Sequence, residues 1–446
     1  MREKVTIPSV TALSSAVMPD RELKALGGLA GEYADKALIS TMAGVHTGVT
    51  GRVFSLVTPA TGPTGQIVRF AHDSITNGMY AALRLGGNGV GAAIGAVGDL
   101  VGGEEERMSI SESRFGRGVQ AAINGLIGDR LEDERNPLAV SMALRKPGRD
   151  LPATRESLLE AFPQPTGKLA IFLHGLCETE EGWWLGTRSD PDRDPVTDGP
   201  APRTYGARLK DDLDFTPLYL RYNTGLHVSE NGRRFSWLLE ELVREWPVDV
   251  TEVALIGHSM GGLVARSACH EADEAGRSWL GRVDHVICLA TPNTGSWLEQ
   301  LVNVGGWALR KVPEVRPFAE FLELRSAGIR DLRFGYLNDQ DWMDRDPHER
   351  LRNHALPQDP ISGIAYHFVS GGLTKHEGHP VATVFGDVLV RRASATSPVT
   401  ASGEPAGDAR HVQGASHIRM LNHPEVYDHL RQWLGAPAAA ETESVA

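Results

Sequence analysis

The chain has 446 residues, of which 41% are hydrophobic and 23% are charged, and its formal net charge is −12. This is the composition of an ordinary globular protein, long enough for one large domain with an appendage or for two domains. No block of the sequence is rich in Lys and Arg, so we expect no nucleic-acid partner. Three cysteines (Cys177, Cys269 and Cys288) are too few for a disulfide scaffold and fit a cytoplasmic protein, with Cys269 and Cys288 as small core residues.

Residues 1–112 are expected to form a helical N-terminal region, with helices over 21–42 and 67–85. No apolar run resembling a secretory signal precedes Asp20, and no stretch is apolar enough to span a membrane. The segment 85–101 is rich in Gly and Ala, and its spacing favours close packing within the protein. Peripheral contact with a membrane surface is the second interpretation of this segment.

Strand and helix patterns alternate through residues 113–435, which predicts one α/β domain with a mainly parallel sheet covered on both faces. A helix over 119–131 comes first. The expected strands cover 138–144, 168–173, 216–222, 253–256, 285–290, 364–370, 381–390 and 410–413. The later helices include one capped by Ser229 with apolar positions through Trp246, one over 263–270, and a terminal helix opened by Pro424. Residues 436–446 are expected to be a disordered tail.

The alternation stops between about 296 and 362, where apolar residues such as Trp297 lie in helix-like patterns. An insertion at this point would lie over the carboxyl ends of the strands, where open α/β sheets bind ligands. We expect a cap or lid that shapes an apolar pocket. Additional helices remote from the site are the alternative.

The most informative motif is Gly257-His258-Ser259-Met260-Gly261-Gly262, which follows an apolar strand and precedes a helix. A serine at such a turn is lifted clear of the backbone at a helix N-terminus, and the flanking glycines avoid Cβ clashes. This geometry predicts that Ser259 is a nucleophile for acyl transfer.

A serine nucleophile needs a base and an acid, which follow it along the chain in the order acid, then histidine. His417, in a loop before the terminal helix, is the preferred base. His423 would cap that helix and His411 would lie in the preceding strand. Asp387, after Gly386, is the preferred acid, with Asp408 and Asp359 as weaker candidates.

Two backbone N–H groups are expected to bind the oxyanion, that of Met260 and that of Leu176 in the loop after strand 168–173. Four residues are expected to line the substrate pocket: His174, Gly175, His258 and Trp297. Nothing in the sequence marks Cys177 as a second nucleophile. The aspartates of segment 190–198 lack the glycine that an EF-hand calcium loop requires, so we expect a solvated loop there.

Four segments together resemble the lipase/esterase branch of the α/β-hydrolase superfamily, in particular bacterial lipase-like and PGAP1-like esterases. They are Phe172-Leu173-His174-Gly175-Leu176, the 257–262 motif, Leu289-Ala290-Thr291-Pro292-Asn293-Thr294-Gly295 and Gly386-Asp387. The resemblance covers roughly 118–435. It implies an α/β-hydrolase fold and a carboxylic-ester hydrolase using Ser259, Asp387 and His417.

The expected substrate is a small-molecule or lipid ester, and neither a metal nor an organic cofactor is needed. Two alternatives remain. The same residues could serve an acyltransferase or thioesterase, or the fold could present a surface for non-enzymatic binding. The sequence leaves the oligomeric state open.

Overall fold

The computed structural model describes most of the α/β region and little of the rest of the chain. The described residues are 22, 111, 114–146, 149–187, 203–295, 325–345, 354–356, 358–372, 398, 400 and 404–435. Several predictions therefore lie outside the described residues: the helices over 21–42 (Glu22 apart) and 67–85, the segment 85–101, the 190–198 loop, the strand 381–390 and the tail 436–446. Trp297 and Asp387 lie outside them as well.

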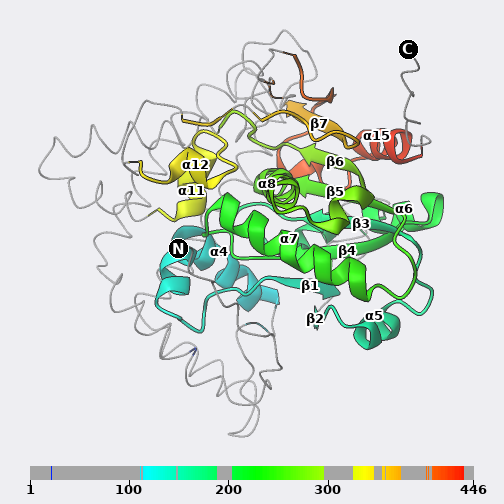
Figure 1. Ribbon diagram of the computed structural model, residues 1–446, viewed down its shortest axis with the longest axis horizontal. Coiled ribbons are helices and arrows are strands. Elements are labelled where there is room, and N and C mark those ends of the chain that lie inside the picture. Colours follow the sequence, from blue (N-terminus) through cyan, green and yellow to red (C-terminus); the bar gives the residue numbers. More distant parts are fainter. Residues whose placement is uncertain are drawn as a thin grey trace, which may run out of the picture.

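The described strands form one mixed sheet in the order β2-β1-β4-β3-β5-β6-β7-β8 (Figure 1). Strand β1 pairs antiparallel with both β2 and β4, and all other neighbours are parallel. The strands are β1 Ala143–Lys146, β2 Arg149–Leu151, β3 Lys168–Leu173, β4 Thr216–Arg221, β5 Glu252–His258, β6 Val283–Leu289, β7 Ala365–Gly372 and β8 Asp408–Gln413. This arrangement confirms the predicted α/β fold with a mainly parallel sheet.

Successive residues of the central strands enter two different cores, because side chains alternate between the faces of a sheet. In β3, Leu169 and Ile171 join one core and Ala170 and Phe172 join the other. The first core is covered by α5 (Arg155–Ala161), α7 (Val228–Glu245) and α8 (Met260–Ala275), the second by α6 (Tyr205–Leu213) and α15 (Pro424–Leu434).

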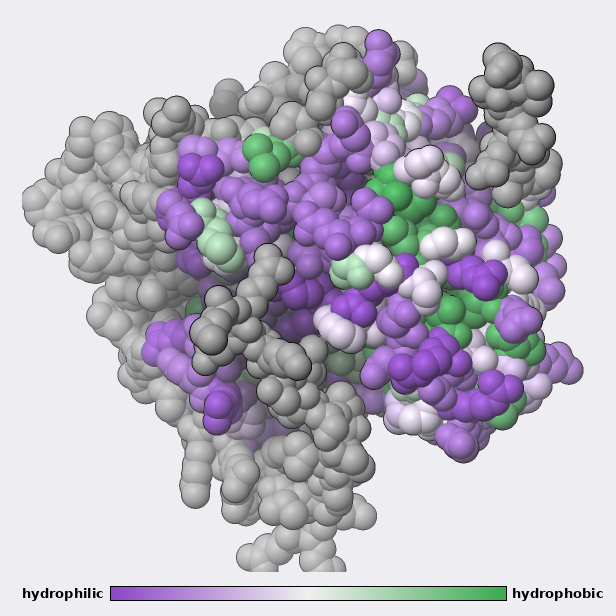
Figure 2. Space-filling view, in the orientation of Figure 1, coloured by the Kyte–Doolittle hydropathy of each residue, from purple (hydrophilic) through white to green (hydrophobic). Residues whose placement is uncertain are grey.

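Figure 1 shows α7 and α8 crossing in front of the strands, and the surface on this side is mostly hydrophilic with smaller apolar areas (Figure 2). Short 3₁₀ helices of the described ranges complete the layers: η2 (Glu180–Trp184), η3 (Ser278–Arg282) and η5 (Ile418–Met420). None of the helices in the described ranges is long and apolar enough to cross a bilayer. The three cysteines are free thiols, and Cys269 and Cys288 are buried core residues as predicted.

The predicted strand over 138–144 is wrong for most of its length, since β1 begins only at Ala143. The segment before it is held by a side chain of α4 (Arg114–Asp133). The Asn124 amide donates to the Leu138 carbonyl at 2.7 Å and accepts the Val140 N–H at 2.8 Å. These bonds satisfy backbone groups that a strand would use in its ladder.

The predicted N-cap of α7 is also wrong. The helix begins at Val228, one residue before Ser229, and its cap position is His227. The capping acceptor is the buried carboxylate of Asp331, which accepts the Val228 N–H at 2.8 Å and lies 3.0 Å from the His227 ring. The Ser229 hydroxyl instead accepts the indole N–H of Trp342. A cap from a residue far along the chain leaves no local sequence signal.

Part of the expected cap insertion is described, as α11 (Ala327–Leu332) and α12 (Asp339–Trp342). It is anchored to α4, where the Ser326 hydroxyl donates to the Gly125 carbonyl at 2.6 Å and Asp129 accepts the Ala327 N–H at 2.7 Å (Figure 1). A Cβ on Gly328 would lie 3.0 Å from Cε of Met260. These helices therefore flank the turn that carries Ser259, and their role as a lid stays a prediction.

Candidate active site

The turn between β5 and α8 holds Ser259 in a strained conformation, with φ +53° and ψ −121°. A non-glycine residue at positive φ is uncommon and marks a position that its surroundings enforce. A Cβ on Gly257 would lie 2.3 Å from the Gly262 nitrogen, and one on Gly261 would lie 2.4 Å from the Leu173 carbonyl oxygen. The turn therefore needs glycine at both positions, as the sequence predicts.

Backbone hydrogen bonds lock this turn to the neighbouring strand. The Ser259 N–H donates to the Leu289 carbonyl at 2.8 Å, and the Gly262 N–H donates to the Ser259 carbonyl at 3.2 Å. The Ser259 hydroxyl makes no capping bond to α8, although serine is a common N-cap residue. The hydroxyl is thus not used to hold the helix. Ser259 as a whole residue is 9% exposed, at the carboxyl ends of the strands.

The loop after β3 approaches Ser259 closely and contains the second predicted oxyanion donor. A Cβ on Gly175 would lie 3.1 Å from Cβ of Ser259. The Gly175 N–H donates to Glu178 Oε2 at 2.9 Å and the Cys177 N–H donates to Thr224 at 3.2 Å. Among the described residues no acceptor is bonded to the N–H of Leu176, which lies between them. This leaves it available for a ligand.

The other predicted donor is the N–H of Met260, the first residue of α8. The first N–H groups of a helix have no intrahelical acceptor, and the helix dipole makes this end favourable for negative charge. Met260 is completely buried, so a ligand atom at this N–H would be shielded from water. The two predicted donors thus come from segments that meet at Ser259.

His417 lies where the sequence predicts it, in the loop between β8 and α15. Its carbonyl accepts from Nε2 of His258 at 3.0 Å, and the two imidazole rings are 4.7 Å apart. His258 immediately precedes Ser259, so the loop that carries His417 contacts the residue next to the candidate nucleophile.

The alternative bases and acids have other positions. His411 lies in β8 and bonds to Ser370, while His423 is the N-cap residue of α15. Asp408 is the first residue of β8, at the opposite edge of the sheet from Ser259, where it accepts from Trp433 and pairs with Arg410. Asp359 is exposed. The role of Asp387 as the acid stays a prediction.

Glu178 is a site residue that the sequence analysis missed. Its carboxylate accepts the Gly175 N–H and lies 3.4 Å from Nδ1 of His258. Burial raises the pKa of this carboxyl, but attraction to His258, the hydrogen bonds from His258 and Gly175, and attraction to His174 outweigh it and lower the pKa to about 2. Nothing near Glu178 in the sequence signals this role, because its ionic partner His258 lies 80 residues further along the chain.

His174, predicted as a pocket residue, is buried behind the loop. Its ring stacks on Tyr222 at 4.4 Å between centroids, and its backbone carbonyl accepts the Tyr222 hydroxyl at 2.6 Å. Burial lowers the pKa of His174. It therefore acts as a support for the loop, and its role in a substrate pocket stays a prediction.

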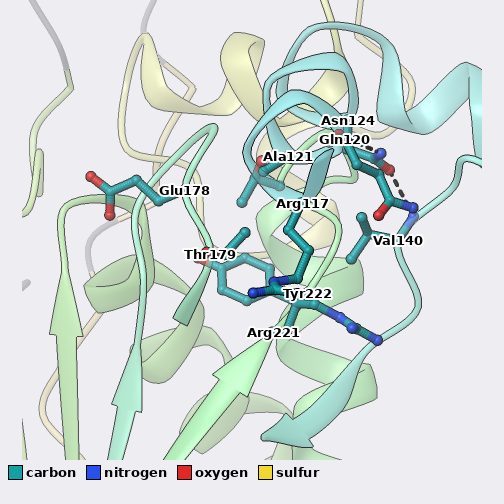
Figure 3. Close-up of a pocket in the computed structure, with 10 residues that line it drawn as sticks. Arg117, Gln120, Ala121, Asn124, Val140, Glu178, Thr179, Arg221 and Tyr222 are labelled. Atoms are coloured by element: carbon teal, nitrogen blue, oxygen red, sulfur yellow. Dashed lines mark hydrogen bonds between the residues drawn. The ribbon is translucent and has the colours of Figure 1, made fainter. Parts of the chain in front are cut away.

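Figure 3 shows a pocket on the far side of this loop, between α4 and the end of β4. Its charged and polar lining includes Arg117, Arg221 and Thr179 but not Ser259. Arg117 pairs with Glu181, and Arg221 pairs with Asp150. In Figure 3 the Glu178 carboxylate points away from both arginines. Ser259 does not line this pocket, although Glu178 does.

Cys177 shares the loop but is no competing nucleophile. Burial raises the pKa of its thiol to about 12, so the reactive thiolate is not populated at neutral pH. A Cβ on Gly125 of α4 would lie 2.2 Å from the Sγ of Cys177. The thiol therefore packs the loop closely against α4.

Comparison with known proteins supports the resemblance. The model of the PGAP1-like alpha/beta domain matches residues 205–303, the segment from α6 to just beyond β6 that includes the Ser259 turn. The matched segment is less than half of the chain. No curated protein matches the chain at a significant level.

Several solved structures are similar to the chain at low identity. The mature lipase BlEst2 of Bacillus licheniformis is 17% identical, with a TM-score of 0.38, covering 61% of this chain and 94% of that chain. Phospholipase PlaB of Legionella pneumophila is 16% identical with a TM-score of 0.38, covering 61% of each. Carboxylesterase CesB of Bacillus subtilis is 12% identical with a TM-score of 0.31, covering 60% and 85%. The described sheet and the matched family model are those of the α/β-hydrolase fold, and this chain is similar to its lipases and esterases.

Proposed function

We propose that the protein is a serine hydrolase of carboxylic esters, with Ser259 as nucleophile, His417 as base and Asp387 as the acid that orients His417. The observation that carries the proposal is the strained turn at Ser259, which leaves its hydroxyl free of helix capping where the segment before Leu176 approaches the start of α8. Strain of this kind persists only where the surroundings enforce it, and it is concentrated at active sites.

The reaction would proceed in two halves. The Ser259 Oγ attacks the acyl carbon while His417 takes its proton, and the oxyanion is bound by the N–H groups of Met260 and Leu176. Collapse of this intermediate breaks the ester C–O bond, and His417 returns the proton to the leaving alcohol. Water, deprotonated by His417, then attacks the acyl-enzyme and releases the acid.

The substrate class follows from the surroundings of the site. Met260 packs at the turn against Gly328 of α11. The sequence of the 296–362 segment is rich in apolar residues such as Trp297. We expect the 296–362 segment to act as a cap and the substrate to be a small-molecule or lipid ester.

Hydrolysis of p-nitrophenyl esters over a range of acyl lengths tests the proposal. Ser259→Ala and His417→Ala are expected to lose several orders of magnitude in kcat/KM, and Asp387→Asn somewhat less. Wild-type turnover no faster than that of Ser259→Ala would contradict it. Adding alcohol or thiol acceptors and analysing the products separates hydrolysis from acyl transfer, and thioester substrates test the thioesterase alternative.

A further inference from the structure

A chain of contacts links three loops around Ser259. The Gly175 N–H donates to Glu178 at 2.9 Å, Glu178 lies 3.4 Å from Nδ1 of His258, and Nε2 of His258 lies 3.0 Å from the His417 carbonyl oxygen. Gly175 directly precedes Leu176, the predicted oxyanion donor. His258 directly precedes the nucleophile Ser259, and His417 is the predicted base. These contacts therefore connect the parts of the site that must keep a fixed geometry.

The partners of His258 determine how many protons its ring carries. A carboxylate and a backbone carbonyl can only accept hydrogen bonds. A neutral imidazole has one N–H, so it would turn an unprotonated nitrogen toward one of these acceptors. Both contacts are hydrogen bonds only if His258 is an imidazolium, with both nitrogens protonated.

His174, in the same part of the molecule, provides an internal comparison. Its Nδ1 lies 2.9 Å from the Gly175 carbonyl, an acceptor, and its Nε2 lies 3.4 Å from the Tyr222 N–H, a donor. One acceptor and one donor suit a neutral ring with a single proton. The two histidines thus differ in the partners that the fold provides.

We propose that Glu178 and His258 are positioning residues. The His258 ring, as an imidazolium, bridges the Glu178 carboxylate and the His417 carbonyl. This bridge fixes the oxyanion loop and the His417 loop relative to Ser259. This inference deepens the proposed ester hydrolysis and rests on it. In the described part of the chain, the titratable groups that interact with Glu178 include His174, Cys177 and Tyr222. The His417 ring lies 4.7 Å from that of His258, and Trp183 meets the His258 ring edge-on at 6.4 Å.

Burial explains why the pair needs both members. His258 is completely buried, and a buried cation is costly unless an anion and hydrogen-bond acceptors compensate it. Glu178 supplies the anion, since its pKa of about 2 keeps it ionised at neutral pH. Replacing Glu178 with glutamine keeps the shape and an acceptor for Gly175 but removes the charge. His258 should then lose its second proton and one of its two contacts.

The protonation state can be measured without any substrate. We would record ring ¹⁵N–¹H spectra of the full-length protein labelled at histidine, at about pH 7.5, one unit above the ordinary histidine pKa of ~6.5. The His258 signals are assigned by their loss in His258→Gln or His258→Asn. We expect both ring nitrogens of His258 to be protonated in the wild type and only one in Glu178→Gln. A singly protonated His258 in the wild type would overturn the proposal.

Kinetics test the positioning role. Glu178→Gln is expected to lower kcat for ester hydrolysis about 100-fold with little change in KM, because a misplacement of about 1 Å costs that much. Glu181→Gln is the matched control, since Glu181 lies three residues away and pairs with Arg117 instead. Its kcat should stay at the wild-type value. In a double-mutant cycle, Glu178→Gln and His258→Gln should be strongly non-additive.

The two measurements separate the possible failures. An unchanged kcat in Glu178→Gln would overturn the positioning role. A wild type without ester hydrolysis beyond that of Ser259→Ala would contradict the proposed function, whereas the ¹⁵N spectra would still decide the state of His258.

Discussion

Histidines gather at both edges of the sheet, and the two clusters have opposite surroundings. At the carboxyl edge, His258 lies between a carboxylate and a carbonyl, next to His417. At the amino edge, His285 and His367 are third residues of β6 and β7, with Nδ1 of one 3.1 Å from Nε2 of the other. A hydrogen bond between these two nitrogens needs a proton on only one of them, so the contact does not require either ring to be charged.

Burial dominates at the amino edge. It lowers the pKa of His285, and together with repulsion from His285 it lowers the pKa of His367 to about 4. His367 also stacks on Trp433 at 4.3 Å, and its Nδ1 has no hydrogen-bond partner in the described part of the chain. The comparison shows that position in the fold, rather than residue type, decides whether a buried histidine packs as a neutral ring or is held as a polar link.

The largest expected effect tests whether ester hydrolysis takes place at the carboxyl ends of the strands. Ser259→Ala should lower kcat/KM for ester hydrolysis by about 10⁵-fold or more, since loss of a serine nucleophile costs on the order of 10⁶. His367→Phe, at the other edge, should leave kcat/KM within about 2-fold of the wild type because it touches no part of the site. Steady-state assays on both variants, with thermal melts to confirm folding, make the comparison. Comparable losses in the two variants would refute the division of roles.

A second prediction concerns the close packing of the carboxyl edge. Gly261→Ala should destabilise the fold by about 3 kcal/mol, because its Cβ would meet the Leu173 and His174 carbonyl oxygens at 2.4 and 2.7 Å. Gly281→Ala is the control, since nothing lies within 4 Å of its Cβ. Urea unfolding gives both free energies. Equal stability of the two variants would show that the turn can relax.

The third prediction uses the lowered pKa of His367 at the amino edge. Because the folded state binds this proton less tightly than the unfolded state, its contribution to stability is complete above about pH 6.5 and is lost as the pH falls toward 4. The loss should be about 3 kcal/mol. His367→Phe should remove this part of the pH dependence. Urea unfolding of both proteins at about pH 7 and pH 4.5 measures this change in the free energy of unfolding. An equal change in the wild type and in His367→Phe would contradict the role given to His367.

The smallest expected effect sharpens the geometry around Ser259. Gly175→Ala would place a Cβ 3.1 Å from both the Ser259 Cβ and the Glu178 carboxylate. A shift of a few tenths of an ångström should relieve this contact, so we expect kcat to fall about 10-fold with stability nearly unchanged. Single-turnover kinetics measure the chemical step. A wild-type rate would mean that the oxyanion loop is not held tightly.

Much of the fold could be predicted because local demands determine it. The runs 169–173 and 253–256 are apolar on both faces, which is typical of buried parallel strands. Gly257 and Gly261 are required by backbone approaches at the turn, so the sequence pattern and the structure agree there. The position of His417 after the last strand follows from the same alternation.

The parts that the sequence did not reveal depend on contacts between distant segments. Asp331 caps α7 across more than 100 residues, and Asn124 takes the backbone groups that a strand over 138–144 would use. Glu178 acquires its role from His258, on another strand. Such polar side chains have no periodicity of their own, so only the assembled fold identifies their partners.

The most direct test of the account is labelling with a fluorophosphonate, followed by mass spectrometry of the digested protein. An ordinary serine hydroxyl is too weak a nucleophile to react, whereas one activated by a base forms a covalent adduct. We predict one adduct per chain, on the peptide containing Ser259, and none in Ser259→Ala. A wild-type protein that stays unlabelled, or an adduct that persists in Ser259→Ala, would contradict the assignment of Ser259 as the nucleophile.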